Sequence, residues 1–197
     1  MVGRVNDKIA IITGAGSGIG EACFQLFAAE GATVVGCGRR SGVLENALSK
    51  VEKNGGSGII VPADLSKKED ANNVVQQTID KFGRVDILVH SASVGWSWSH
   101  QSENSMNDIA TTPPEKWEEV IGINLNACYY MCHGVLQHML ERGSGSIVNV
   151  ASISGMVGMQ TAHTYCSAKG GIINLTRAMA ATYAQQGVRT NCVCPGY

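Results

Sequence analysis

Residues 13–20 read Thr13-Gly14-Ala15-Gly16-Ser17-Gly18-Ile19-Gly20, directly after an apolar run and directly before an amphipathic segment. This position predicts a tight turn from a buried strand into a helix. Glycines suit such a turn because the chain bends sharply, approaches a ligand closely and packs its helix on the strand, and a Cβ would obstruct each of these. The first N–H groups of the helix can hold a pyrophosphate, so the stretch predicts a dinucleotide site.

The rest of the chain repeats the alternation of strand and helix. Continuous runs rich in Val and Ile are separated by helical stretches, which predicts a doubly wound α/β fold, a parallel sheet with helices on both faces. Two helices carry capping-box patterns, Ser66 with Glu69 and Thr112 with Glu115. With 197 residues, we expect a single domain over residues 1–197. The predicted strands are 9–13, 33–37, 58–61, 86–89, 146–150 and 189–193.

Composition excludes several classes of protein. A net charge of −1 without a basic stripe gives no support for nucleic-acid binding. Residues 1–8 do not resemble a secretory signal and no apolar run is long enough to cross a membrane, so we expect a cytoplasmic protein without a membrane anchor. The seven cysteines are an odd number scattered over predicted elements, which favours reduced thiols and no metal site.

The second strand ends in Gly38-Arg39-Arg40, where an acidic residue would ordinarily bind the ribose 2′-hydroxyl of NAD. Gly38 removes the repulsion that an acid would exert on a 2′-phosphate, and Arg39 offers a fork of donors to it. The pattern therefore favours NADP(H) over NAD(H); the alternative is that both arginines are solvated loop charges. Asp64, after the third strand, is a candidate acceptor for the adenine amino group.

Residues 96–112 (WSWSHQSENSMNDIATT) are too irregular for either a helix or a strand and predict a long loop. The loop leaves the carboxyl end of the fourth strand, the edge where doubly wound sheets bind ligands. It is therefore either part of the substrate wall or a mobile surface excursion.

Four features in order resemble the short-chain dehydrogenase/reductase family: the glycine turn, Asn124 in GINLNA, Ser152 in IVNVASISG, and Tyr165 with Lys169 in YCSAK. The resemblance runs along all 197 residues. It implies a Rossmann fold with strand order 3-2-1-4-5-6, and hydride transfer between a nicotinamide cofactor and a ketone or secondary alcohol. It also implies a homo-oligomer, a dimer or tetramer.

Tyr165 and Lys169 are four residues apart on a helix and so share one face, where the ammonium can lower the pKa of the phenol. Such a phenol can exchange a proton with a carbonyl oxygen, and Ser152 can donate a hydrogen bond to the same oxygen. By resemblance, Lys169 also binds the nicotinamide ribose and Asn124 holds a water of a proton relay. The predicted cofactor-binding residues are Gly14, Gly16, Ser17, Gly18, Ile19, Gly20, Arg39, Arg40, Asp64, Leu65, Ser91, Ala92, Ser93, Tyr165, Lys169, Pro195 and Gly196.

Two segments depart from the family pattern. The family usually has Asn-Asn-Ala-Gly after the fourth strand, where this chain has His90-Ser91-Ala92-Ser93, so the amides that steady the turn are lost. The family also continues beyond the Pro195-Gly196 turn with a substrate lid and a seventh strand. The sequence therefore predicts a truncated chain that lacks both, and leaves its own turnover open.

Two alternatives to a carbonyl reductase or alcohol dehydrogenase remain at this point. An enoyl reductase of the same fold would carry a wider gap between the tyrosine and the lysine. A non-catalytic nucleotide-binding or interaction module would keep the glycine turn without needing Ser152, Tyr165 and Lys169 together.

Overall fold

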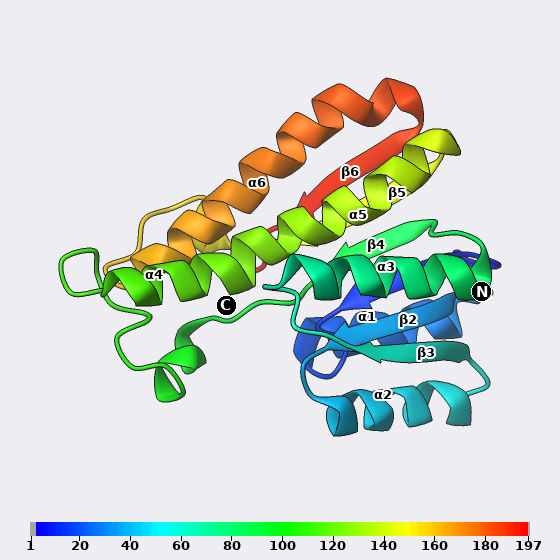
Figure 1. Ribbon diagram of the computed structural model, residues 1–197, viewed down its shortest axis with the longest axis horizontal. Coiled ribbons are helices and arrows are strands. Elements are labelled where there is room, and N and C mark those ends of the chain that lie inside the picture. The colour runs from blue at the N-terminus through cyan, green and yellow to red at the C-terminus, as the bar shows by residue number, and fades with distance from the viewer. Residues whose placement is uncertain (1–2, 197) are drawn as a thin grey trace.

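The computed structural model describes residues 3–196 of the chain. Its strands are β1 (Ile9–Thr13), β2 (Thr33–Gly38), β3 (Ser57–Pro62), β4 (Ile87–His90), β5 (Gly145–Val150) and β6 (Val188–Val193). Its α-helices are α1 (Gly18–Ala29), α2 (Ser41–Lys53), α3 (Lys68–Phe82), α4 (Pro114–Ile121), α5 (Ala127–Glu141) and α6 (His163–Tyr183). All the strand pairs are parallel, in the order β3-β2-β1-β4-β5-β6, which confirms the predicted topology (Figure 1).

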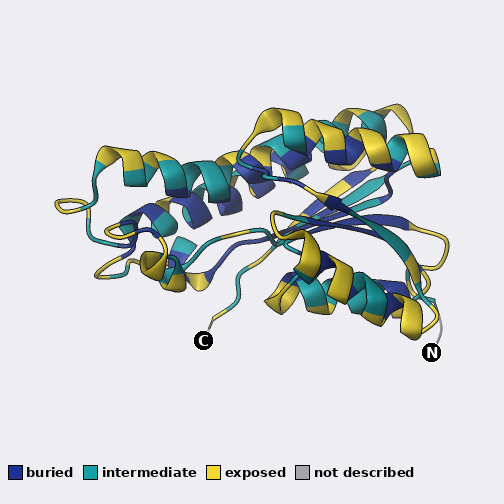
Figure 2. Ribbon diagram, turned by 60° about the horizontal axis from the view of Figure 1, so that its bottom comes forward, coloured by how far each residue is buried: buried dark blue, intermediate teal, exposed yellow. Residues whose placement is uncertain are grey.

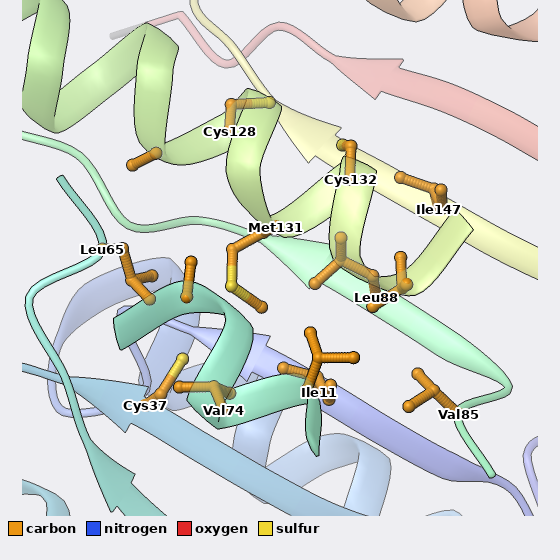
Figure 3. Close-up of a cluster of buried hydrophobic side chains, with 14 of the residues drawn as sticks. Ile11, Cys37, Leu65, Val74, Val85, Leu88, Cys128, Met131, Cys132 and Ile147 are labelled. Carbon is orange, nitrogen blue, oxygen red and sulfur yellow. The ribbon is translucent and has the colours of Figure 1, made fainter. Parts of the chain in front are cut away.

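The sheet has an apolar core on each face. On one face α3, α5 and α6 pack against residues such as Ile11 and Leu88; on the other, α1 and α2 pack against Ala10 and Ile12 (Figure 1). Figure 3 shows Val74 of α3 and Met131 of α5 directed at the first of these faces. Neighbouring residues of β1 therefore pack into the cores on opposite faces of the sheet. Because both faces are buried, the strands are continuous apolar runs in the sequence.

Burial follows the same layering. The strands are mostly buried between helices whose outer faces are exposed (Figure 2). The predicted strands all exist, with ends that differ from the expected ends by at most one residue. Because β1, β4 and β5 lie at the centre of the sheet, the loops after their carboxyl ends meet along one edge, and that edge carries the site described below.

Both predicted capping boxes are wrong. Helix α3 starts after Lys67, and the hydroxyl of Ser66 donates to Asp64 Oδ1 (2.7 Å) instead of capping the helix. Helix α4 starts after Pro113, and Thr112 Oγ1 donates to the carbonyl of Asp108 (2.7 Å). In both cases the hydroxyl bonds back to the preceding loop, a competing local bond that the spacing of the residues does not reveal.

The long helical segment after Pro113 is interrupted by a π-helix, Gly122–Asn126, between α4 and α5. Single π-turns inside helices widen the backbone ladder and often mark functional sites. The segment 96–112 is also more ordered than expected, because it contains a 3₁₀-helix, Trp96–His100, and buries Ser102, Ser105 and Met106.

No helix within residues 3–196 is both long and apolar enough to cross a membrane. Met1, Val2 and Tyr197 lie outside the described residues, and so do the ends of the predicted domain 1–197.

Candidate active site

The glycine turn after β1 has the geometry that the sequence predicts. Gly14 (φ +68°) and Gly18 (φ +56°) adopt left-handed backbone conformations that side chains rarely adopt. A Cβ on Gly20 would lie 2.2 Å from the carbonyl oxygen of Gly14, so only glycine lets α1 pack this closely on the turn. Helix α1 then begins at Gly18, and its first N–H groups and positive end lie at the edge of the sheet.

Two adjoining cavities lie along this edge, and Gly14, Ser17, Ala92 and Ser93 line both. The first, about 300 Å³, extends from the glycine turn past the ends of β2 and β3. The second, about 330 Å³, extends past the ends of β5 and β6 to α6. Two cavities joined at a glycine turn fit the two halves of a dinucleotide, whose pyrophosphate would cross the shared residues.

The cavities bring together most of the residues that the sequence singled out. In the first lie Gly14, Gly16, Ser17, Arg39, Arg40, Asp64, Leu65, Ala92 and Ser93. In the second lie Gly14, Ser17, Ile19, Ser91, Ala92, Ser93, Ser152, Tyr165, Lys169, Pro195 and Gly196. Within the described residues, neither lining includes Gly18, Gly20 or Asn124.

Lys169 is buried beneath the second cavity. Its side chain is 2% exposed and its Nζ donates to the carbonyl oxygen of Val150 (2.9 Å) at the end of β5. Burial lowers the pKa of Lys169 to about 8, although three nearby thiols oppose this shift. Its Nζ lies 5.5 Å from the centre of the Tyr165 ring, so a positive charge is held beside the phenol at neutral pH.

Ser152 directly follows β5 and lies on the same cavity as Tyr165. Its Oγ accepts a hydrogen bond from the backbone N–H of Ser154 (3.1 Å) and lies 3.3 Å from Ser154 Oγ, to which it donates. These contacts fix the rotamer of a serine that is 9% exposed. Ser152, Tyr165 and Lys169 therefore meet at one cavity, and backbone groups hold the serine and the lysine in place.

Asn124 lies behind the cavities, in the π-helix. Its side chain is fully buried, its Oδ1 accepts from the N–H of Val94 (2.9 Å) and its Nδ2 donates to the carbonyl of Val94 (3.1 Å). The amide thus clamps the backbone next to Gly95, which approaches the ring of Tyr165. In this structure Asn124 positions the cavity wall, and its predicted contact with a relay water remains a prediction.

The His90-Ser91-Ala92-Ser93 turn is held by Thr13, a residue to which the sequence pattern assigns no such role. Thr13, opposite His90 in the register of β1 and β4, accepts from the N–H groups of Ser91 (3.0 Å) and Ala92 (2.9 Å) through its Oγ1. The same oxygen lies 3.2 Å from His90 Nδ1. The Thr13 hydroxyl therefore ties the turn to the glycine turn, in a chain that lacks the family's amides there.

His90 is consequently a neutral ring with a fixed tautomer. Because Thr13 Oγ1 already accepts two hydrogen bonds, its own hydrogen is directed to His90 Nδ1, and the ring hydrogen is carried by Nε2. Within residues 3–196, Nε2 is buried without a hydrogen-bond partner. Burial, followed by the charge of Lys169, lowers the pKa of His90 to about 3.

This pKa predicts an acid-sensitive fold. Below pH ~6.5 an unfolded His90 binds a proton that the folded protein does not, so stability falls as pH falls toward the folded pKa of about 3. The contribution of this one group approaches about 1.4 kcal/mol per pH unit. Urea unfolding at several pH values should show that His90→Asn, which retains an acceptor for Thr13, flattens this slope. An equally steep slope in the variant would mean that His90 does not cause it.

The 3₁₀-helix Trp96–His100 reaches both cavities. The Trp96 ring meets the Tyr165 ring edge-on at 5.2 Å between centres, and Trp96 lines the second cavity. Trp98 lines the first cavity, with the Arg39 guanidinium 4.9 Å from the centre of its ring. Two tryptophans in a polar segment were the feature of the sequence that indicated a binding role for this loop. The structure favours the interpretation that the loop forms part of the wall of the site over the interpretation that it is a mobile surface excursion.

Comparisons with known proteins agree with this geometry. The model of the short chain dehydrogenase family matches residues 8–197. A cyclohexanol dehydrogenase of Acinetobacter sp. is 34% identical over 197 residues, which cover 100% of this chain and 75% of that protein. A 3beta-hydroxysteroid dehydrogenase of Mediterraneibacter gnavus is 33% identical over 195 residues, which cover 99% of this chain and 67% of that protein.

Solved structures agree as well. The crystal structure of levodione reductase superposes with a TM-score of 0.90 at 31% identity, covering 98% of this chain and 72% of that one. The NAD⁺-bound xylitol dehydrogenase also gives 0.90, at 27% identity and with the same coverage. Because the family model spans nearly the whole sequence and these relatives match throughout it, the chain belongs to the short-chain dehydrogenase family and is an oxidoreductase.

Proposed function

We propose that this protein transfers a hydride between NADP(H) and a ketone or secondary alcohol, with Tyr165 as the residue that moves the proton. The observation that carries the proposal is the meeting of Ser152, Tyr165 and Lys169 on the cavity that adjoins the glycine turn. A non-catalytic module would need only the glycine turn. The convergence of a phenol, a hydroxyl and a buried ammonium has no use in such a module.

Tyr165, Ser152 and Lys169 each have a different role in the proposed reaction. A nicotinamide bound in the second cavity would supply the hydride to the carbonyl carbon, or accept it from the alcohol. Tyr165 gives its phenolic proton to the carbonyl oxygen in reduction and takes it back in oxidation. The Ser152 hydroxyl hydrogen, which is donated to Ser154 Oγ in this structure, turns to the same oxygen as negative charge develops on it. The Lys169 ammonium, anchored on Val150, favours the phenolate and so eases the loss of the proton.

The first cavity supports the preference for NADP(H). Gly38, Arg39 and Arg40 line it together, and Asp64 lines it from the end of β3. No carboxylate pairs with Arg39 in the part of the chain that the structure describes, so its N–H donors remain available for a 2′-phosphate. Asp64 Oδ1 already accepts from the backbone N–H and the hydroxyl of Ser66, which leaves its second oxygen for the adenine amino group.

Arg39→Ala tests this preference. The substitution removes charge-assisted hydrogen bonds to the 2′-phosphate, which NADH lacks, so the affinity for NADPH should fall by about 10- to 100-fold while that for NADH changes little. Kd values from nicotinamide fluorescence titrations measure both affinities. Equal losses for the two cofactors would remove the argument for NADP(H).

The activity itself is tested with a panel of cyclic and acyclic ketones, each assayed with NADPH and with NADH by the absorbance of the reduced nicotinamide. The named relatives that act on ring alcohols, cyclohexanol and 3beta-hydroxysteroid dehydrogenases, make cyclic ketones the first choice. Turnover with at least one ketone supports the proposal. Tight cofactor binding without turnover of any compound would instead favour the non-catalytic module.

A further inference from the structure

Arg39 and Trp98 form one wall of the first cavity, although they come from different parts of the chain. Arg39 follows β2, and Trp98 belongs to the short helix after β4. The guanidinium carbon lies 4.9 Å from the centre of the indole ring, within the range of a cation–π contact. Arg39 itself is exposed, so without this contact its long side chain would sample many rotamers.

Trp98 is in turn held in place by Glu119 of α4. The indole Nε1–H donates to Glu119 Oε1 (2.8 Å), and Ser102 Oγ donates to Oε2 (2.7 Å). Lys116 donates to Ser102 Oγ (2.9 Å) and lies 3.3 Å from Glu119 Oε2. Both carboxylate oxygens are therefore engaged, and Trp98 connects this network to Arg39 of the first cavity.

Burial tends to raise the pKa of Glu119, but the hydrogen bonds from Ser102, Trp98 and Lys116 outweigh burial and hold it below its ordinary value. The anchor is therefore a carboxylate at neutral pH. A charged acceptor makes a stronger hydrogen bond to the indole than a neutral one, so the orientation of Trp98 depends on this charge.

We propose that Trp98 is a positioning residue for Arg39, and that the pair, anchored by Glu119, is what discriminates NADP(H) from NAD(H). This inference rests on the proposed preference for NADP(H), and it attributes that preference to Arg39 as positioned by Trp98. An aromatic ring that covers the flat face of a guanidinium leaves the N–H groups at its edge for a phosphate. Because the ring holds the side chain in one place before binding, less rotamer freedom is lost when the 2′-phosphate arrives.

The discriminating quantity is the ratio of the affinities for NADPH and NADH, which a general loosening of the loop would not change. Trp98→Leu removes the ring and should lower the affinity for NADPH about fivefold, with little change for NADH. Trp98→Phe keeps an aromatic face and should retain part of the ratio. Glu119→Gln should lower the ratio in the same direction, because it weakens the anchor.

Glu118→Gln is the matched control. Glu118 is the exposed neighbour of Glu119 on the same helix, and its side chain makes no hydrogen bond or ion pair within residues 3–196. This variant should keep the wild-type ratio. The double variant Arg39→Ala with Trp98→Leu should show no further loss of NADPH affinity beyond that of Arg39→Ala alone, because Trp98 acts through Arg39.

The outcomes separate the two proposals. If Arg39→Ala weakens both cofactors equally, the preference for NADP(H) fails. If Arg39→Ala is selective but Trp98→Leu leaves the ratio unchanged, the preference stands and the positioning role of Trp98 is wrong. If Trp98→Leu strengthens the binding of both cofactors, the indole occupies space that the adenosine needs, and the positioning role is likewise overturned.

Discussion

Tyr165→Phe is expected to lower kcat for ketone reduction by about 10²- to 10⁴-fold, the range that general acid catalysis contributes. The substitution removes the phenolic proton and leaves the ring that packs edge-on against Trp96. The anchor of Lys169 on Val150 does not involve the phenol, so the second cavity should keep its shape. Steady-state kinetics with the best ketone of the panel measures the loss.

Cofactor titration supplies the control for this variant. The Kd of NADPH should change by less than about threefold, because the hydroxyl contributes to proton transfer more than to binding. Full activity in the variant would show that another group donates the proton. A large loss of cofactor binding would instead assign Tyr165 a binding role.

Gly20→Ala is expected to have the second largest effect, on the fold as well as on the site. The new Cβ would lie 2.2 Å from the oxygen and 2.6 Å from the carbon of the Gly14 carbonyl, and backbone atoms cannot move aside as a flexible side chain can. Either α1 or the glycine turn must shift. We expect a loss of about 3 kcal/mol in the free energy of unfolding, at the upper end of overpacking, together with a loss of NADPH binding.

Gly42→Ala is the matched control in α2, where a Cβ would meet nothing within 4 Å. An alanine in an open helical position should be neutral or stabilise the protein by up to about 1 kcal/mol. Urea unfolding of both variants gives the comparison. If Gly20→Ala were as stable as Gly42→Ala and still bound NADPH, the close packing of α1 on the turn would not matter for either property.

The positions of the strands in the sequence could be predicted because each signal is local, whereas their order in the sheet came from the resemblance to the family. The strands bury both faces and so read as apolar runs, and the glycine turn follows the first of them directly. Tyr165 and Lys169 lie one helical turn apart, so their shared face also follows from spacing. The resemblance to the family supplied the catalytic role of Ser152. From the sequence alone, this serine would be interpreted as a residue that caps a turn at the end of a strand.

The remaining features depend on contacts between segments far apart in the chain. Thr13 supports the turn after His90 across 78 positions, a contact that no local pattern marks. To predict the contact between Trp98 and Arg39, one would likewise have to know the path of the segment after β4. An irregular polar sequence does not specify that path. The capping boxes failed for a related reason, because Ser66 and Thr112 had closer partners in the preceding loops.

A crystal structure of the protein with the oxidised cofactor and a bound ketone tests the central claim most directly. We expect the nicotinamide in the second cavity, the carbonyl oxygen within about 3 Å of Tyr165 Oη and Ser152 Oγ, and the carbonyl carbon within about 3.5 Å of the ring. A nicotinamide bound elsewhere, or a Tyr165 hydroxyl directed away from the carbonyl oxygen, would contradict the proposed chemistry.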